Sequence, residues 1–242
     1  MLQDLLNFRR AVRHYDPDKP IDSAVVRHCL ELARLAPSSS NLQLYEFYHI
    51  TGARTRDAIA SLCLGQTAAT TAQQLVVFVS RPDLFKRRMP AVYAQEVNNL
   101  MKYSTAEEQA RVLPQIKSYY QRLLPLLYGY GFGLMGPLRR LIFGPLALFR
   151  PMYRQLGNAD VRIVAHKSCA LAAQTFMLAM AEAGQDTCPM EGLDSGRIKK
   201  ILGLPRRAEI TMVVSCGIRI PEKIRGERQR LPFPEIYRER AD

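Results

Sequence analysis

The chain has 242 residues, of which 48% are hydrophobic and 23% charged, as is normal for a folded protein. Its net charge of +12 suits an anionic partner, such as a phosphate-bearing ligand, a membrane surface or a nucleic acid. The arginines are dispersed, and the sequence contains no helix-turn-helix, RNP-like or Cys/His finger motif, so we expect no nucleic acid as a partner.

The cysteines are odd in number, far apart and outside any C-x-x-C pair, which predicts neither a disulfide framework nor a metal site. They are Cys29, Cys63, Cys169, Cys188 and Cys216. The first ten residues lack an apolar core of signal-peptide length. Together these features predict a cytoplasmic protein.

The N-terminal segment combines a short apolar helix pattern with a basic turn. Leucine and phenylalanine recur on one helical face between residues 2 and 8, and three arginines follow within five residues, before Pro17 and Pro20. These arginines are either solvated or placed to grip a phosphate, because a guanidinium offers a planar fork of donors to its oxygens. The turn consists of Arg9, Arg10, Ala11, Val12 and Arg13.

A helix is predicted from Asp22, a good N-cap, to Ala36, where Pro37 prevents its continuation. The next residues, 37 to 43, are dense in short polar side chains that favour turns. They form either a plain surface loop or a hydrogen-bonding rim for a polar ligand. A strand is predicted over residues 45 to 51.

One more strand and three more helices are predicted up to residue 124. The patterns predict a helix over 56–64, a buried strand over 75–79, a helix over 91–103 and another over 105–124 that Pro114 interrupts.

The segment from Leu123 to Leu138 has no charged residue, and arginines follow it. Prolines and glycines break it, and it falls short of the roughly 20 residues of a membrane-spanning helix. Two interpretations remain: a hydrophobic lid or dimer surface, which we favour, or peripheral contact of residues 123–153 with an anionic membrane.

The longest helix pattern runs from Asp160 to the stop signal Gly184, with small and apolar residues at three- and four-residue steps that predict burial. An irregular turn is predicted at 188–192, where free backbone amides make either a plain connection or a ligand seat. A helix over 194–202, a buried strand over 210–218 and a polar tail over 225–242 complete the chain.

Four of these features have the order and spacing of one known family. They are the basic turn near residue 10, the polar loop near 40, the amide-rich loop near 190 and the Arg-x-Arg-Leu-Pro pair near 230. In this order and spacing they resemble the FMN-dependent nitroreductase family, over residues 1–80 and 160–232. The resemblance implies a single α+β domain over 1–242, with a central, mainly antiparallel sheet flanked by helices. We expect residues 81–157, which the resemblance does not cover, to be a helical insertion or lid within this domain.

The resemblance also implies which residues bind FMN, since flavin chemistry in this family needs no obligate catalytic side chain. The basic turn and Arg228 with Arg230 match phosphate contacts, and the 37–43 loop matches a segment that reaches the flavin from the partner subunit. The loop near 190 matches the backbone that faces the reactive flavin nitrogen. The residues implied are Arg9, Arg10, Ala11, Val12, Arg13, Pro37, Ser38, Ser39, Asn41, Gln43, Gln66, Pro189, Met190, Glu191, Gly192, Arg228 and Arg230.

The chain departs from the family at three places. Ala11 stands where many members have serine, Gln66 and Ala69 stand where some have asparagine and lysine, and the 81–157 region is enlarged. Loss of that lysine should weaken stabilisation of an anionic reduced ring.

The implied function is an NAD(P)H-dependent FMN oxidoreductase. NADH or NADPH would reduce the flavin and leave before a nitroaromatic, quinone or other conjugated, lipophilic acceptor binds, and the protein would act as a homodimer. Two alternatives stay open: a relative with another flavin reaction, such as reductive dehalogenation or flavin oxidation, and a non-catalytic flavin- or lipid-binding protein. We expect the protein in the cytoplasm. It would also associate with a membrane if residues 123–153 contact one.

Overall fold

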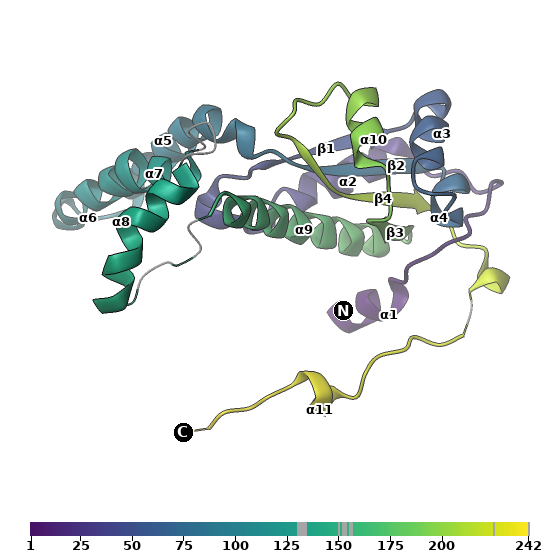
Figure 1. Ribbon diagram of the computed structural model, residues 1–242. Helices are drawn as coiled ribbons and strands as arrows, with labels where there is room; N and C mark the ends of the chain where they lie inside the picture. The colour runs from purple at the N-terminus through teal and green to yellow at the C-terminus, as the bar shows by residue number, and fades with distance from the viewer. Residues whose placement is uncertain (130–134, 150, 152–153, 155–156, 225, 242) are drawn as a thin grey trace.

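The computed structural model describes residues 1–129, 135–149, 151, 154, 157–224 and 226–241. It forms a four-stranded sheet with helices on both faces and a helical arm at one end (Figure 1). The strands are β1 (Tyr45–Ile50), β2 (Gln74–Ser80), β3 (Asp186–Met190) and β4 (Glu209–Gly217). The α-helices are α1 (Leu2–Phe8), α2 (Ser23–Ala33), α3 (Ala53–Ser61), α4 (Thr67–Thr70), α5 (Phe85–Tyr103), α6 (Ala106–Ser118), α7 (Leu124–Tyr128), α8 (Met135–Phe149), α9 (Asn158–Glu182), α10 (Ser195–Ile201) and α11 (Phe233–Ile236).

The sheet has the order β1-β2-β4-β3, and every neighbouring pair of strands is antiparallel. All seven residues of β2 are buried, because helices cover both faces of this central strand. That burial explains why residues 75–79 are an unbroken apolar run instead of an alternating one. The α+β class and the antiparallel sheet predicted from the sequence are confirmed.

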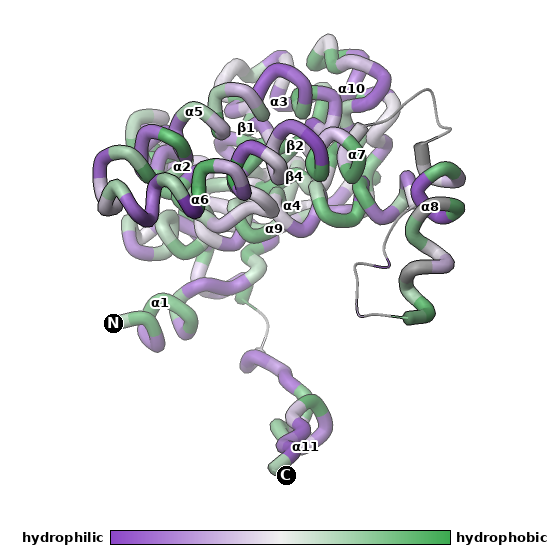
Figure 2. The backbone as a smooth tube through the Cα atoms, turned by 90° about the vertical axis from the view of Figure 1, so that its left-hand side faces the viewer, coloured by the Kyte–Doolittle hydropathy of each residue, from purple (hydrophilic) through white to green (hydrophobic). Residues whose placement is uncertain are grey.

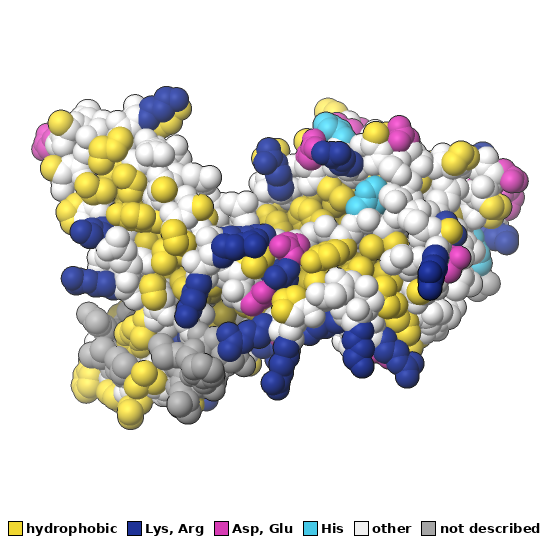
Figure 3. All heavy atoms as spheres, turned by 90° about the horizontal axis from the view of Figure 1, so that it is seen from above, with side chains coloured by type: hydrophobic (Ala, Val, Ile, Leu, Met, Phe, Trp, Pro, Cys, Tyr) yellow, Lys and Arg dark blue, Asp and Glu magenta, His cyan; other side chains and the backbone are white. Residues whose placement is uncertain are grey.

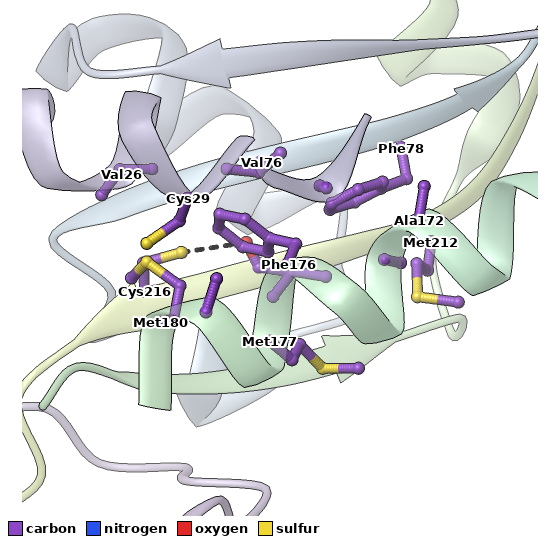
Figure 4. Close-up of a cluster of buried hydrophobic side chains, with 14 of the residues drawn as sticks. Val26, Cys29, Val76, Phe78, Ala172, Phe176, Met177, Met180, Met212 and Cys216 are labelled. Carbon is purple, nitrogen blue, oxygen red and sulfur yellow. Dashed lines mark hydrogen bonds between the residues drawn. The ribbon is translucent and has the colours of Figure 1, made fainter. Parts of the chain in front are cut away.

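One face of the sheet packs against α2 and α9. Phe176 of α9 contacts Phe78 of β2, with ring centroids 5.5 Å apart, and Met180 packs nearby against Cys216 (Figure 4). The predicted long buried helix is therefore present, two residues longer at its start. Among the described residues α9 also has the length and hydropathy of a membrane span, but half of its most apolar window is buried, as expected of a core helix.

The other face of the sheet packs against α3, α4 and α10. Val77 and Val79 of β2 lie in this second core, together with Ile59 of α3 and Ile198 of α10. The N-terminal segment also joins it, because Val12 is buried among the same residues. The two cores hold the basic turn close to β3 and α4.

The turn predicted at 188–192 is wrong for its first three residues. Cys188, Pro189 and Met190 belong to β3 and pair with Ser215, Val214 and Val213 of β4. Pro189 is tolerated because β3 is an edge strand, where a missing N–H need not break the ladder. Only the residues from Glu191 onward form the loop.

Helices α5 to α8, which lie between β2 and α9 in the chain, form an arm at one end of the sheet (Figure 1). Its first helix begins at Phe85, six residues before the predicted start, and contains Pro90. The predicted interruption at Pro114 is wrong: α6 continues to Ser118, and the irregular stretch is a π-helix over Tyr119–Leu123. The capping box of Thr105 and packing against α5 keep α6 intact despite the one backbone hydrogen bond that a proline removes.

The two chain ends lie on the same side of the molecule. Helix α1 packs near α9, and the C-terminal segment with α11 extends away from the sheet (Figures 1 and 2). Three large apolar side chains on this segment are about two-thirds exposed: Leu231, Phe233 and Ile236.

Candidate functional site

The basic turn is held in an extended conformation against β3. The Val12 amide donates to the Thr187 carbonyl at 3.2 Å, and Ala11 forms a parallel bridge with Thr187. Arg228, far along the chain, donates to the carbonyl of Arg9 and to that of Asn7. The Arg228 guanidinium therefore brings the C-terminal segment to the basic turn.

This arrangement gathers positive charge around Arg9. Burial and the nearby positive charges of Arg228 and Arg230 lower the pKa of the Arg9 guanidinium below its usual value. Its Nε atom is buried and has no hydrogen-bond partner among the described residues. A buried donor without an acceptor is costly, and like charges repel, so this cluster is suited to an anion.

A cavity of about 520 Å³ opens beside the cluster. Its lining comes from both chain ends: Arg9, Arg10, Ala11, Arg13, Gly226, Glu227, Arg228, Gln229 and Arg230. The cavity thus has the size and charge for a phosphate group, and five of its nine lining residues are arginines.

The basic turn is tied to the sheet by an ion pair. Arg219 donates from Nε to Asp186 at 2.7 Å, and its backbone N–H donates to the other carboxylate oxygen at 2.8 Å. The same guanidinium donates to the Phe8 carbonyl at 2.9 Å and lies 4.3 Å from the centre of the Phe8 ring. Because Phe8 directly precedes Arg9, this pair fixes where the turn begins.

The loop after β3 is held by Gln66. Its amide Nε2 donates to the Gly192 carbonyl at 2.7 Å and to the Cys63 carbonyl at 3.0 Å. Glu191 and Gly192 are exposed, and Thr67, next to Gln66, shares a 360 Å³ cavity with Arg10 and Arg13. A Cβ atom added at Gly192 would meet the Gln66 amide at 3.5 Å, an ordinary contact, so space alone does not require glycine there.

The polar loop 37–43 lies elsewhere and is conformationally strained. Ser40, Asn41 and Gln43 have positive φ angles of 52°, 52° and 48°. Such angles disfavour residues with a side chain and cluster at functional sites. Inside the loop, Ser38 Oγ accepts a hydrogen bond from the backbone N–H of Gln43 at 3.1 Å.

Side chains of the inserted arm hold this loop in place. Tyr128 hydrogen-bonds Ser39 at 2.7 Å, Tyr119 hydrogen-bonds Ser40 at 2.8 Å, and Arg88 of α5 donates to the Gln43 carbonyl. Sequence reasoning missed all three, since no local motif marks a side chain whose partner lies 45 to 89 positions away in the chain. The arm and the polar loop are therefore joined by hydrogen bonds.

Within one chain the predicted residues divide into two groups. The basic turn, Gln66, the residues 189–192 and the arginine pair lie together around β3. The polar loop instead lies by α9, where the Ser39 amide donates to Ser168, and lines a cavity of about 260 Å³ with residues of the arm.

The cysteine side chains lie inside the protein. All five are buried and free. Burial raises the pKa of Cys29 and Cys63 to about 11 and that of Cys169 to about 12. Even Cys188, beside Arg9 and Arg13, has a raised pKa because burial outweighs the two positive charges. No group of histidine, cysteine and acidic residues suited to a metal ion occurs in the described part of the chain.

Comparisons with known proteins place this site in context. MhqN of Bacillus subtilis, which carries the name of an NAD(P)H nitroreductase, is 21% identical over 232 residues, covering 96% of this chain and 95% of its own. Protein DrgA of Synechocystis is 27% identical, and the match covers 95% of this chain and 89% of DrgA. These relatives span nearly the whole length of the chain.

Solved structures agree on the fold. The nitroreductase ydfN of Bacillus subtilis superposes with a TM-score of 0.73 at 21% identity and 98% coverage of both chains. A structure from Exiguobacterium sibiricum is named as a nitroreductase and was solved in complex with FMN. It superposes with a TM-score of 0.70 at 19% identity, and the match covers 99% of this chain and 97% of that one. The Nitroreductase family model matches residues 6–218, most of the chain. The basic turn, the strained polar loop and the sheet therefore belong to a member of the Nitroreductase family, as the sequence motifs predict.

Proposed function

We propose that the protein is an FMN-dependent oxidoreductase that uses NADH or NADPH to reduce a nitroaromatic, quinone or other conjugated acceptor. The observation that carries the proposal is the buried, unpartnered Nε of Arg9 inside a cluster of like charges. A phosphate would accept that hydrogen bond and neutralise the repulsion.

The residues that would hold FMN are those gathered around β3. Arg9, Arg228 and Arg230 would bind its phosphate, and Gln66 would fix the Gly192 carbonyl so that the 190–192 backbone faces the ring. When bound, FMN supplies the hydride chemistry, and the protein supplies binding and orientation.

We further propose that the active form is a homodimer. The polar loop and the arginine cluster line different cavities in one chain, so a partner would have to supply the loop to each flavin site. The exposed apolar side chains of the C-terminal segment and of α1 support such a contact. The cavity beside the polar loop supports a lipophilic acceptor, because it is lined by Ser39, Ser40, Tyr119, Leu127, Tyr128, Val161 and Val164.

The test begins with the absorption spectrum of the purified protein, which we expect to show bound flavin after incubation with FMN. Rapid mixing with NADH or NADPH should bleach this flavin, and a quinone or nitroaromatic should restore it. Steady-state rates at varied donor and acceptor should give parallel double-reciprocal lines. A colourless protein that ignores added FMN would refute the proposal.

The same measurements separate the open alternatives. Flavin that neither donor bleaches would favour a non-catalytic binding protein. Loss of the flavin itself during turnover would favour a flavin-oxidising relative, because a simple reductase returns the flavin unchanged.

Gln66 offers a test of the ring-facing side of the site. Gln66→Leu keeps the volume but removes the donor to the Gly192 carbonyl, so the loop should hold FMN less well. We expect the Kd for FMN to rise by roughly 2–10-fold, the worth of about one neutral hydrogen bond. Gln115→Leu, on the exposed side of α6, is the matched control and should leave the Kd unchanged. Equal Kd values for the two variants would remove Gln66 from the site.

A further inference from the structure

The arm carries a charge asymmetry that the proposed function does not use. Between residues 109 and 159 the sequence has no aspartate or glutamate. The same stretch has seven basic residues: Arg111, Lys117, Arg122, Arg139, Arg140, Arg150 and Arg154. A segment of this length with cations alone is suited to an anionic surface.

Helix α8 presents an apolar stripe within this stretch. Leu138, Leu141, Pro145 and Leu148 are exposed and follow one another at steps of three, four and three residues, so they lie on one side of the helix. Leu141, Leu148 and Phe149 are 74%, 79% and 87% exposed. Exposed apolar side chains of this size are costly in water when they are contiguous.

The opposite side of α8 is fixed to the protein. The Arg139 side chain is 1% exposed, and it donates to the Leu126 carbonyl at 2.6 Å and to the Gly129 carbonyl. Helix α8 therefore packs on α7 through Arg139 and turns the leucine stripe outward. Figure 2 shows the hydrophobic residues of α8 set apart from the rest of the molecule, and Figure 3 shows basic and hydrophobic side chains side by side on the arm.

Charged residues flank the stripe. Arg140 is exposed on α8 itself, and Arg154, also exposed, donates to the Ala147 carbonyl near the end of the helix. An apolar stripe bordered by arginines is the pattern of a helix that lies in a membrane interface, with the guanidinium groups at lipid phosphates.

We propose that α8 is an interfacial helix that binds the surface of an anionic lipid bilayer through Leu138, Leu141, Leu148 and Phe149. This inference goes beyond the proposed oxidoreductase function and does not depend on it. A second copy of the chain fits the same stripe less well, because two such segments would bring only positive charges together.

The absence of tryptophan from the sequence gives a direct test. Phe149→Trp places the sole indole at the end of the stripe, and its emission should shift to shorter wavelength when vesicles of phosphatidylcholine with phosphatidylglycerol are added. Tyr103→Trp, 74% exposed at the end of α5, is the matched control and should not shift. Equal responses of the two variants would overturn the proposal.

Sedimentation of the full chain with the same vesicles completes the test. Leu141→Gln with Leu148→Gln leaves the charge unchanged and should lower the vesicle partition coefficient at least about tenfold, given the apolar area that each leucine buries. Leu35→Gln, at a leucine 72% exposed after α2, should leave it unchanged. Equal partition of wild type and the double variant, or equal binding to phosphatidylcholine alone, would overturn the proposal. So would a double variant that changes only the oligomeric state, which would assign the stripe to a second copy.

Discussion

Replacing Arg9 by methionine should raise the Kd for FMN by about 10–100-fold, the range expected when a charge-assisted hydrogen bond to a phosphate is lost. The variant removes the buried Nε donor and one of the three like charges of the cluster. Riboflavin, which lacks the phosphate, should bind both proteins with the same affinity. Titration of flavin absorption or fluorescence measures both values.

The control for Arg9→Met is Arg27→Met on α2, at an exposed arginine that pairs only weakly with Glu31 at 3.7 Å. This substitution removes one positive charge, as Arg9→Met does, but at a position outside the arginine cluster. Parallel losses for FMN and riboflavin in the Arg9 variant would mean that the arginine supports the fold of the turn and not the phosphate. Removing a like charge should also leave the unfolding temperature of the ligand-free variant at or above that of the wild type.

Asp186→Asn should destabilise the protein by about 3 kcal/mol, because it leaves the largely buried Arg219 without its counter-charge. For a chain of this size that corresponds to a fall in Tm of roughly 6–12 °C. The variant should also bind FMN more weakly, since Arg219 fixes Phe8 and thereby the start of the basic turn. Thermal unfolding without flavin and flavin titration measure the two effects.

Asp4→Asn provides the comparison, at an aspartate whose ion pair with the N-terminus is exposed to solvent. Exposed pairs contribute little, so we expect no measurable change in Tm. A normal Tm for Asp186→Asn together with normal FMN affinity would show that the Arg219 pair positions nothing.

Local sequence signals predict the central residues of most helices and strands. The apolar run of β2, the spacing of α9 and the N-cap at Asp22, whose carboxylate accepts from the Ala24 amide at 2.8 Å, all depend on neighbours within a few residues. The gathering of Arg9 and Arg228 was also predicted, but only through the family motifs.

Features that depend on distant partners were not predictable. Pro189 indicated a turn, and only its position on an edge strand beside Val214 explains why it lies in a sheet. Likewise, Tyr119 and Tyr128 carry no motif, and their role comes from the way the arm folds back onto the polar loop. The dimer and the binding roles of the individual residues stay predictions, because they depend on molecules other than this chain.

The burial of the cysteines has a consequence for a protein with the proposed acceptors. Quinones are electrophiles, and they alkylate thiolates instead of thiols. With pKa values of about 11 for Cys29 and Cys63 and about 12 for Cys169, almost none of these groups is ionised at neutral pH, and none of the five is exposed. A quinone acceptor would therefore meet no exposed thiol on this protein, and covalent inactivation at cysteine would not limit its working life.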